Sequence, residues 1–472
     1  FAGEKPTDGT TYTAGNTGGS LGTGVVQFVG SATELLQTSL ANATTYYYKV
    51  FSNAASCYSP GIAIDTTPAA PVATQWSYAT TAASMAPPGL DPWSNVVVSG
   101  SNDDYFHSMA DANGTRASGF APFPTGGPIQ SRPSILPAGY RTPAGSGVNI
   151  AYVSSQDGFL YAVNSATGAQ VWKSASLGTT LQGGAGVWIQ ALKPLTFTGG
   201  VTSDVVFVGT SNTGNAINNK VYALNGAAAA AGGGTIVWTF APGNMDIISS
   251  TPYVDYTNNV VWVTSRAAGG IGQPSVWKLN ASTGALAGGT ATWTFNDVDS
   301  SPVPNADGAF IYVGTNAGTL KAIKVSDGTF SSHTPSSGAG AIKGMPWPLS
   351  WVSASVGSPD QIIFSRTATV HSVSFDGSTF TPTSAWGSGT GVVQLTGTPT
   401  VSAPVDDGAG NLYIGGSDGK VHRLLVSNGS DAAQMPATGV SGTMGDPTFN
   451  WDTSSIHVGA TNGHIYTYTT PF

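Results

Sequence analysis

One pattern recurs eight times along most of this chain of 472 residues. Each copy is a short run of β-branched and aromatic residues, and the last residues of successive runs lie 44 to 55 positions apart. The runs are Asn95–Val98, Ala151–Val153, Val206–Val208, Val261–Val263, Ile311–Val313, Ile362–Phe364, Leu412–Ile414 and Ile456–Val458. A fixed period of this length indicates a repeat architecture, because each unit buries its apolar face only against its neighbours.

Each repeat has the pattern of a four-stranded antiparallel unit. A Gly-containing turn such as Gln156–Gly158 leads from the first run to a second strand, here Leu160–Val163. A further strand tends to carry a tryptophan, at Trp172, Trp238, Trp293 and Trp386. A small residue, any residue and a proline precede the innermost strand, in Ser131–Pro133, Ser250–Pro252, Ser300–Pro302, Gly344–Pro346 and Gly397–Pro399. Four-stranded units repeated in this way are typical of a β-propeller.

Eight units predict eight blades in an all-β fold, over residues 74–472. The last unit, residues 442–472, is too short for four strands. A segment with the expected tryptophan, Thr74–Tyr78, lies ahead of the first unit. We expect this segment to be the outer strand of the last blade and to close the ring, since closure leaves only short protected edges.

The unit Tyr152–Trp172 resembles the repeat of the pyrroloquinoline-quinone-type propellers, and the resemblance covers roughly residues 72–472. That family contains both quinone-dependent dehydrogenases and cofactor-free assembly scaffolds, so the fold does not choose the function. A dehydrogenase of this kind implies two adjacent cysteines, a Glu, Asn and Asp ligand set for calcium, and an Asp base. The chain has a single cysteine, Cys57, and no stretch with that ligand set. We therefore expect no enzyme, no catalytic residue and no bound quinone.

Residues 1–68 lack the repeat and are predicted to form a separate module, joined by a linker at 69–73. Leu40–Phe51 resembles the later half of a fibronectin type III domain, whose sandwich has seven strands. We expect earlier strands at Gly9–Tyr12 and Val25–Val29, and the start of the last strand at Cys57–Gly61. About four strands fit, so the sandwich is expected to be incomplete, with Cys57 as a small buried apolar residue.

The six histidines are interpreted mainly as packing residues. Three of them, His107, His371 and His422, occupy the second-strand position that Tyr161 and Trp277 occupy in other repeats. The remaining three are His457, in an aromatic position of the first run, His464 in the last unit and His333 in a Ser-rich loop. No two have the spacing of a metal site.

Acidic pairs occur in turns at Asp103–Asp104, Asp297 with Asp299, and Asp406–Asp407. A calcium ion in one such turn is the one cofactor these residues leave open, although aspartate is ordinary in turns and the ligand order of an EF-hand loop is absent. Four Asn-x-Ser/Thr sequons are glycan acceptors only in a host with that machinery: Asn42, Asn113, Asn280 and Asn428. Stacking of carbohydrate on the repeated tryptophans is a weaker interpretation than packing between blades.

Charged residues make up only 8% of the chain, and the net charge of −8 comes without a basic cluster. Nucleic acid is therefore excluded as a partner. The long charge-free run between Lys220 and Asp246 contains three consecutive glycines and a proline, which favour two strands and a loop over a membrane span. A surface with few charges suits proteins that pack side by side with little repulsion.

These features predict a non-enzymatic, extracellular or cell-surface structural protein, with any secretion leader outside this chain. The propeller would be a scaffold for surface assembly that forms or joins filaments. Partners would be proteins, copies of the chain bound through the N-terminal module by strand addition, or surface glycans. The alternative is an enzyme, quinoprotein-like or glycan-active, that uses the propeller funnel. A third possibility is an envelope accessory protein that docks to a filament or to redox proteins.

Overall fold

The computed structural model describes residues 5–21, 23–30, 45–54, 57–59, 61–66, 76–141, 147–178, 180–214, 217–269, 272–336, 338–342, 344–349, 360–436 and 439–472. The chain divides into two compact units, Phe1–Val72 and Ala73–Phe472. Within the described chain, no helix is both long and apolar enough to cross a membrane.

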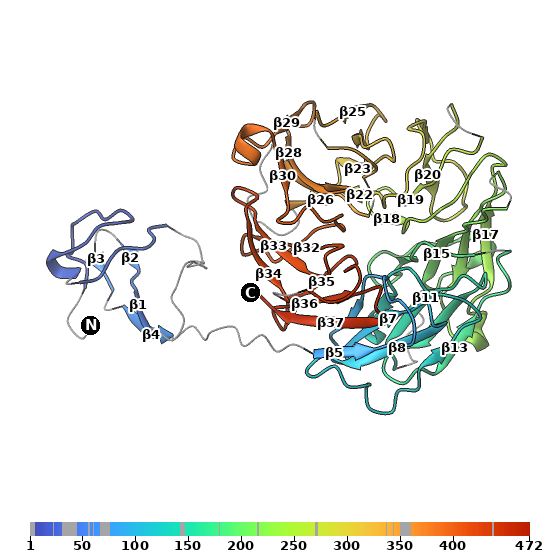
Figure 1. The fold of residues 1–472 in the computed structure, drawn as a ribbon, viewed down its shortest axis with the longest axis horizontal. Coiled ribbons are helices and arrows are strands. Elements are labelled where there is room, and N and C mark those ends of the chain that lie inside the picture. The colour runs from blue at the N-terminus through green and yellow to red at the C-terminus, as the bar shows by residue number, and fades with distance from the viewer. Residues whose placement is uncertain are drawn as a thin grey trace. The chain divides into compact units, whose positions relative to one another are not determined.

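The second unit is an eight-bladed β-propeller, as predicted (Figure 1). Each blade is an antiparallel sheet whose strands follow one another from the ring axis outward. The first four blades consist of β6 Gly89–Asp91, β7 Val96–Gly100, β8 Tyr105–Ala110 and β9 Phe123–Pro124; β10 Ser134–Leu136, β11 Ile150–Ser154, β12 Leu160–Asn164 and β13 Gln170–Lys173; β14 Gly186–Trp188, β15 Val205–Gly209, β16 Val221–Asn225 and β17 Ile236–Phe240; and β18 Tyr253–Asp255, β19 Val260–Thr264, β20 Val276–Asn280 and β21 Thr292–Trp293.

The other four blades consist of β22 Val303–Pro304, β23 Phe310–Gly314, β24 Leu320–Lys324 and β25 Phe330–His333; β26 Trp347–Pro348, β27 Asp360–Arg366, β28 Thr369–Phe375 and β29 Phe380–Pro382, with β30 Val392–Gln394 also paired to β28; β31 Val405–Asp406, β32 Asn411–Gly415, β33 Val421–Leu425 and β34 Asp431–Met435; and β35 Thr448–Asn450, β36 Ser455–Gly459, β37 His464–Thr469 and β5 Trp76–Ala79. Short 3₁₀ turns are η2 Ala138–Tyr140, η3 Thr198–Gly200, η4 Ala229–Ala231 and η6 Gly387–Gly389.

The repeated apolar runs are the second strands of the blades. Every residue of β11 and β15, for example, is buried, because neighbouring blades cover both faces of each sheet. This two-sided burial explains why the runs are continuous rather than alternating in polarity. The core is accordingly a ring of clusters between blades, such as the one that joins Phe207 and Trp238 of the third blade to Val261 and Trp277 of the fourth.

The tryptophans near the outer edge of the blades pack against the next blade, which agrees with their interpretation as packing residues. Trp238 donates its Nε1–H to the carbonyl of Ala281 at 2.8 Å. Its ring lies over Gly284, where an added Cβ would come within 2.5 Å of the indole. Gly284 also has a φ of +72°, so glycine is required twice over. Trp293 and Trp386 make the same bond, to the carbonyls of Gly328 and Val426.

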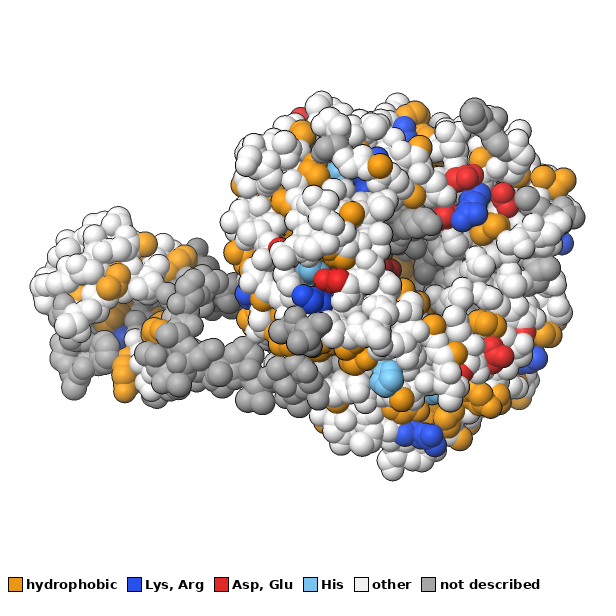
Figure 2. Space-filling model, in the orientation of Figure 1, with side chains coloured by type: hydrophobic (Ala, Val, Ile, Leu, Met, Phe, Trp, Pro, Cys, Tyr) orange, Lys and Arg blue, Asp and Glu red, His pale blue; other side chains and the backbone are white. Residues whose placement is uncertain are grey.

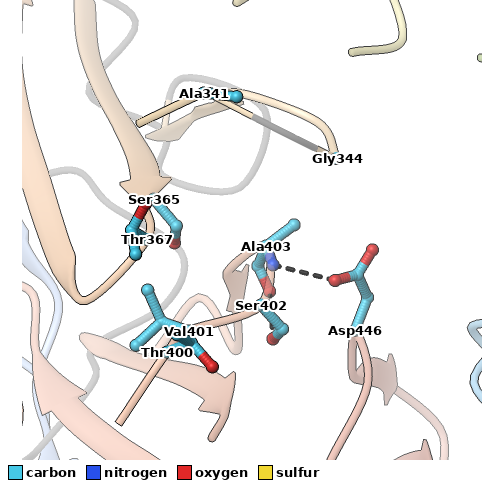
Figure 3. Close-up of a pocket in the computed structure, with 9 residues that line it drawn as sticks. All are labelled: Ala341, Gly344, Ser365, Thr367, Thr400, Val401, Ser402, Ala403 and Asp446. Carbon is cyan, nitrogen blue, oxygen red and sulfur yellow. Dashed lines mark hydrogen bonds between the residues drawn. The ribbon is translucent and has the colours of Figure 1, made fainter. Parts of the chain in front are cut away.

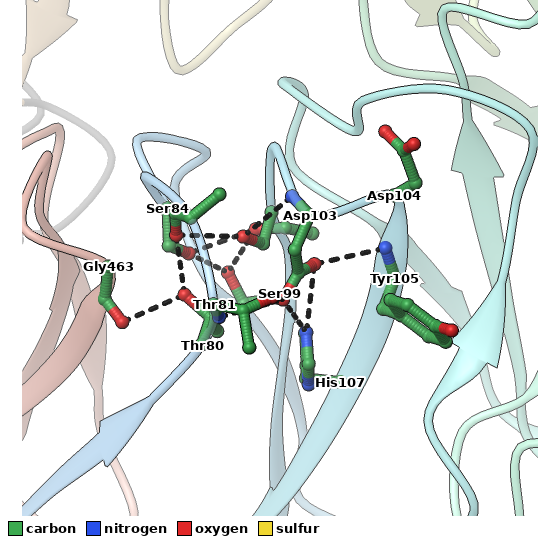
Figure 4. A network of polar contacts seen from close by, with 12 residues as sticks. Thr80, Thr81, Ser84, Ser99, Asp103, Asp104, Tyr105, His107 and Gly463 are labelled. Carbon is green, nitrogen blue, oxygen red and sulfur yellow. Dashed lines mark hydrogen bonds and ion pairs between the residues drawn. The ribbon is translucent and has the colours of Figure 1, made fainter.

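The strand that begins at Trp76 completes the last blade. Trp76–Ala79 pairs antiparallel with β37, with Trp76 opposite Thr467 and Ala79 opposite His464, while residues 74 and 75 lie outside the described residues. The segment after it is tied to the same blade, because Thr80 Oγ1 donates to the carbonyl of Gly463 at 2.8 Å (Figure 4).

Two expectations within the repeats are wrong. The inner strand of the seventh blade follows Ser402–Pro404 rather than Gly397–Pro399. Gly397 and Thr398 have φ values of +83° and +56°, which no extended strand adopts. Trp386 likewise lies after β29 rather than on a strand, although its indole still donates a hydrogen bond to the next blade, at the carbonyl of Val426.

The N-terminal unit contains two small hairpins among its described residues. β1 Tyr46–Val50 pairs with β4 Ile62–Thr66, and β2 Asn53–Ala54 pairs with β3 Cys57–Tyr58, while η1 spans Gly19–Leu21. The expected strand Tyr46–Val50 is present, and the rest of Leu40–Phe51 before Thr45 lies outside the described residues.

Three details of this unit differ from expectation. Gly9–Tyr12 and Val25–Val29 form no strand: the first begins in a turn where Gly9 has a positive φ, and in the second only Val25 forms an isolated bridge, to Thr17. Cys57–Tyr58 pairs back on Asn53–Ala54, and the last strand is Ile62–Thr66. Cys57 is exposed rather than buried, because its hairpin has only two residues on each side. The fibronectin-like interpretation remains a prediction.

Candidate functional site

The segments that lead into the inner strands surround the propeller axis. The residue two positions before each inner strand is, in chain order, Pro87, Arg132, Gly184, Thr251, Ser301, Met345, Ala403 and Asp446. The Thr251 N–H donates to Ser301 Oγ at 3.0 Å, and the Ser301 N–H donates to the Gly344 carbonyl at 3.2 Å. The ring of residues is therefore uncharged except for Arg132 and Asp446.

A cavity of about 440 Å³ adjoins this ring (Figure 3). Three consecutive blade junctions and the turn between β27 and β28 line it, through Ala341, Gly344, Ser365, Thr367, Thr400, Val401, Ser402, Ala403 and Asp446. The Asp446 carboxylate points to the Ala403 N–H and accepts its hydrogen bond at 2.8 Å. Small side chains and backbone groups thus form the walls, and one carboxylate supplies the charge.

Arg132 and Asp446 influence each other electrostatically. Burial raises the pKa of the Asp446 carboxyl above its usual value, while the hydrogen bond from Ala403 and the positive charge of Arg132 oppose that rise. Burial lowers the pKa of Arg132, and Asp446 opposes that change. Arg132 Nη2 also donates to Thr448 Oγ1 at 2.7 Å. The segments around the axis therefore contain one cation, Arg132, and one carboxyl group, that of Asp446, whose pKa is raised.

The chemistry available in this cavity is binding of a small polar group. Ser365 Oγ is buried without a hydrogen-bond partner in the described part of the chain, and it lines the cavity. The hydroxyl and the Asp446 carboxyl together offer a donor and an acceptor. Among the residues the structure describes, no group of three or more His, Cys, Asp and Glu side chains is arranged to hold a metal ion.

The acidic pairs identified from the sequence bind turn backbone and neighbouring side chains. Asp103 accepts the N–H groups of Thr81 and Tyr105, at 3.1 and 3.0 Å, and contacts His107 (Figure 4). Asp299 receives a bidentate pair from Arg266, at 2.8 and 2.9 Å.

In the third pair, Asp407 accepts from Asn411 and Tyr413, and Asp406 accepts the N–H of Gly408. Burial raises the pKa of Asp406 to about 6. These acids stabilise turns, and they belong to three different blades.

Three of the histidines have carboxylate partners that the sequence analysis missed, and one of them, His457, has its Nε2 3.3 Å from Asp111 Oδ1. His107 Nε2 lies 3.1 Å from Asp103 Oδ2, and His422 lies between Asp418 and Asp431, with Nδ1 2.9 Å from Asp431 Oδ2. In the second blade, Asp157 and Tyr161 occupy the positions equivalent to Asp103 and His107, and the Tyr161 hydroxyl donates to the Asp157 carboxylate at 2.5 Å. The sequence feature that could have revealed these pairs is an aspartate four residues before the aromatic position, in the turn that leads to the second strand.

The other contacts of the buried histidines agree with the packing interpretation. His371 stacks on Phe364, with ring centres 4.9 Å apart, and burial lowers its pKa to about 3. His457 Nδ1 lies 2.6 Å from Thr467 Oγ1, and burial lowers its pKa to about 3 as well. His333 and His464 lie near aromatic rings, those of Phe380 and Tyr466.

Comparison with known proteins agrees with this architecture. A family model described as outer membrane protein assembly factor BamB matches residues 156–341. The crystal structure of BamB from Moraxella catarrhalis is similar over 83% of this chain and 98% of its own, with 17% identity and a TM-score of 0.54. The propeller is of the pyrroloquinoline-quinone repeat type.

A designed protein has the same fold. The computationally designed Ika8 protein is similar over 83% of this chain and 97% of its own, with 11% identity and a TM-score of 0.54. No curated protein matches the chain. At these identities the likeness shows the fold alone, so the function of this pyrroloquinoline-quinone-type propeller has to be argued from its own surfaces.

Proposed function

We propose that this protein is a non-enzymatic interaction protein of the cell surface or extracellular space. The propeller is the scaffold, and the N-terminal module binds protein partners, in the first place copies of the same chain. The family model that matches the repeats is described as an assembly factor, which is a protein-binding activity and supports this class of function. Figure 2 shows few and scattered charges on the visible face of the propeller, a surface with little electrostatic repulsion between copies.

The observation that carries the proposal is the exposure of apolar side chains in the N-terminal module. Val50 and Ile62 lie opposite each other on β1 and β4, and they are 68% and 78% exposed. Val25, Phe28 and Val29 are exposed in the same unit. Exposed apolar side chains of this kind mark interaction sites, because water-exposed apolar area is reduced when a partner covers it.

Self-association tests the proposal. We expect the full chain to form concentration-dependent oligomers or filaments, measured by light scattering after gel filtration and by electron microscopy. The double variant V50D/I62D places charges on the exposed pair and should leave a monomer. The matched control I236D/L286D changes two exposed apolar residues of the propeller and should assemble as the wild type does. A wild-type chain that is monomeric at every concentration would contradict self-assembly.

The cavity at the axis favours a second candidate, an enzyme that works in the propeller funnel. Its support is that the unpartnered Ser365 hydroxyl and the Asp446 carboxyl line the same cavity. Dye-linked oxidation of alcohols and sugars, with added quinone and calcium, distinguishes the two functions. We expect no turnover, and ordinary turnover that is lost in D446N would establish the enzyme instead.

A further inference from the structure

Three exposed aromatic side chains lie in the corresponding segments, between the first and second strands, of three consecutive blades. Trp451 lies in the turn between β35 and β36, Trp93 in the turn between β6 and β7, and Tyr140 in η2 between β10 and β11. They are 55%, 60% and 45% exposed. Because the strands of each blade alternate in direction, these turns all lie on one face of the propeller. We call the three side chains the aromatic row.

Folding does not explain the aromatic row. The corresponding turns of the fifth and seventh blades, Asn305–Ala309 and Asp407–Gly410, contain no aromatic residue. In the fourth blade the turn has Tyr256, whose hydroxyl donates to the Val187 carbonyl and whose ring packs on Trp188 at 4.8 Å. Every other described tryptophan is buried or half-buried. Two exposed indoles in equivalent turns therefore indicate a binding role.

Hydrogen bonds between blades connect the turns of Trp451 and Trp93. Asn450 Oδ1 accepts the Asp452 N–H at 3.0 Å, which fixes the turn around Trp451. Asn450 Nδ2 donates to Asp111 Oδ2 at 2.8 Å, and the Asp111 N–H donates to the carbonyl of Asn95 at 3.0 Å. Asn95 ends the turn that holds Trp93, so the first two members of the aromatic row are joined through Asp111.

A second set of bonds connects Trp93 to Tyr140. The buried Asp91 accepts the N–H of Ser94 at 3.1 Å and the side chain of Asn149 at 2.8 Å. Asn149 Oδ1 in turn accepts the N–H of Ala138, the first residue of η2, at 2.8 Å. The three turns are thus held in one rigid arrangement before any ligand arrives. Such preorganisation lowers the entropic cost of binding.

The groups around the aromatic row fit a neutral sugar polymer. Aromatic faces provide apolar surface for the C–H faces of pyranose rings, and Ser94, Asn95, Asp452 and Thr453 offer donors and acceptors for hydroxyl groups. Phe449 packs edge-on against Trp451, with ring centres 4.8 Å apart, and orients the indole.

Other ligand classes fit these turns less well. The residues 92–95, 137–140 and 451–454 include no lysine or arginine, and Arg141, the next residue, is buried. Anionic membranes and nucleic acids are bound through such cations. Protein interfaces have a contiguous apolar centre, whereas polar turns separate these rings onto three blades. A repeating ligand matches a repeating set of aromatic side chains.

We propose that the aromatic row is a binding surface for a neutral polysaccharide, whose sugar rings stack on Trp451, Trp93 and Tyr140 in successive blades. This site is independent of the axial cavity and of the N-terminal module, so it does not rest on the proposed self-association. It requires no catalytic group, and the bound chain is left unchanged.

Calorimetry of the full chain with cellohexaose, chitohexaose and maltohexaose tests this site. We expect the wild type to bind at least one of them, and W93A and W451A each to weaken that binding by tenfold or more. The aromatic variants W93F and W451F should retain part of the affinity. The control Y105A removes a side chain that is 40% exposed at the opposite ends of the strands, and it should bind as the wild type does.

Two outcomes would overturn the proposal. The first is a wild type that binds none of the three sugars, or binds one equally well after W93A and W451A, while the melting temperatures show that the variants are folded. The second is binding to phosphatidylcholine vesicles that depends on the aromatic row in the absence of sugar binding, which would assign the row to a membrane surface. If an alanine variant fails to fold, the phenylalanine variants decide between the outcomes.

Discussion

Trp76 lies opposite Thr467 in the last sheet, although almost the whole propeller sequence separates the two residues. The same tryptophan donates its Nε1–H to the carbonyl of Asp111 in the first blade at 2.8 Å. Its ring covers Gly114, as Trp238 covers Gly284 elsewhere in the ring. One short strand therefore completes the last blade and is hydrogen-bonded to the first, so the closure of the ring depends on it.

Removal of this strand is expected to open the ring. Deletion of residues 1–80 should expose the edge of β37 and lower the melting temperature strongly, whereas deletion of residues 1–66 should leave the propeller as stable as in the full chain. The single change W76A should cost about 3–5 kcal/mol, the usual effect of removing a buried tryptophan side chain. Thermal and urea unfolding followed by near-ultraviolet circular dichroism measure these effects. Equal stability of the two deletions would disprove closure by this strand.

The aspartate and the aromatic residue four positions later form an interchangeable pair. Asp103 with His107 and Asp157 with Tyr161 occupy equivalent positions, and both aspartates accept a backbone N–H from the preceding blade junction, those of Thr81 and Gly126. H107Y is therefore expected to cost less than 1 kcal/mol, within the usual range of a tolerated exchange. H107L leaves the buried carboxylate without this partner and should cost about 1–3 kcal/mol.

Urea unfolding of H107Y, H107L and the control Y161H measures the exchange. Y161H should be tolerated for the same reason as H107Y. If H107Y destabilises the protein as much as H107L does, the two positions are not equivalent.

The propeller could be predicted from the sequence because its strand and turn patterns recur at a regular spacing. Buried strands such as Ala151–Val153 and turns such as Gln156–Gly158 recur, so an error in one blade is corrected by the others. The errors fell where one repeat departs from the rest. In the seventh blade Gly397–Pro399 and Ser402–Pro404 both match the inner-strand pattern, and the positive φ values of Gly397 and Thr398 exclude the first.

The sequence repeat did not predict which side chains of different blades contact one another. The aspartates that pair with His107 and His422 within a blade had a sequence signal, their position four residues earlier, whereas the axial pair Arg132 and Asp446 comes from junctions far apart in sequence. The aromatic row was missed because Trp93 and Trp451 lie outside the repeated tryptophan position. Non-local proximity of this kind requires the ring geometry itself.

Acid should destabilise the propeller through its buried histidines. Burial holds the pKa of His371 at about 3, and the positive charges of Arg366 and His333 add to this effect. An unfolded histidine has a pKa of about 6.5. Below that pH the unfolded chain binds a proton that the folded chain does not, so stability is present above pH 6.5 and falls toward pH 3. Between pH 6.5 and 5 the loss from His371 is about 2 kcal/mol.

The variant H371F removes this proton while keeping an aromatic ring on Phe364. Its free energy of unfolding should fall less steeply between pH 6.5 and 5 than that of the wild type, by about 2 kcal/mol over the interval. Measurement at pH 8, where histidine is neutral in both states, separates any packing cost from the titration. Parallel pH profiles of the two proteins would show that His371 does not titrate as described.

The last prediction concerns the glycine that ends the second strand of several blades. An added Cβ at Gly209 would lie 2.3 Å from Ile248 Cγ2, and the equivalent distance at Gly314 is 2.2 Å from Ile342 Cγ2. G209A should therefore cost roughly 1–3 kcal/mol through overpacking, and I248A alone about 2–5 kcal/mol through the cavity it leaves. In G209A/I248A the new methyl group enters that cavity, so the combined cost should be clearly less than the sum. The control G288A, with no heavy atom within 4 Å of the added Cβ, should stay within about 0.5 kcal/mol of the wild type in the same urea unfolding series. Strict additivity of the two changes would mean that the glycine is not held there by its isoleucine neighbour.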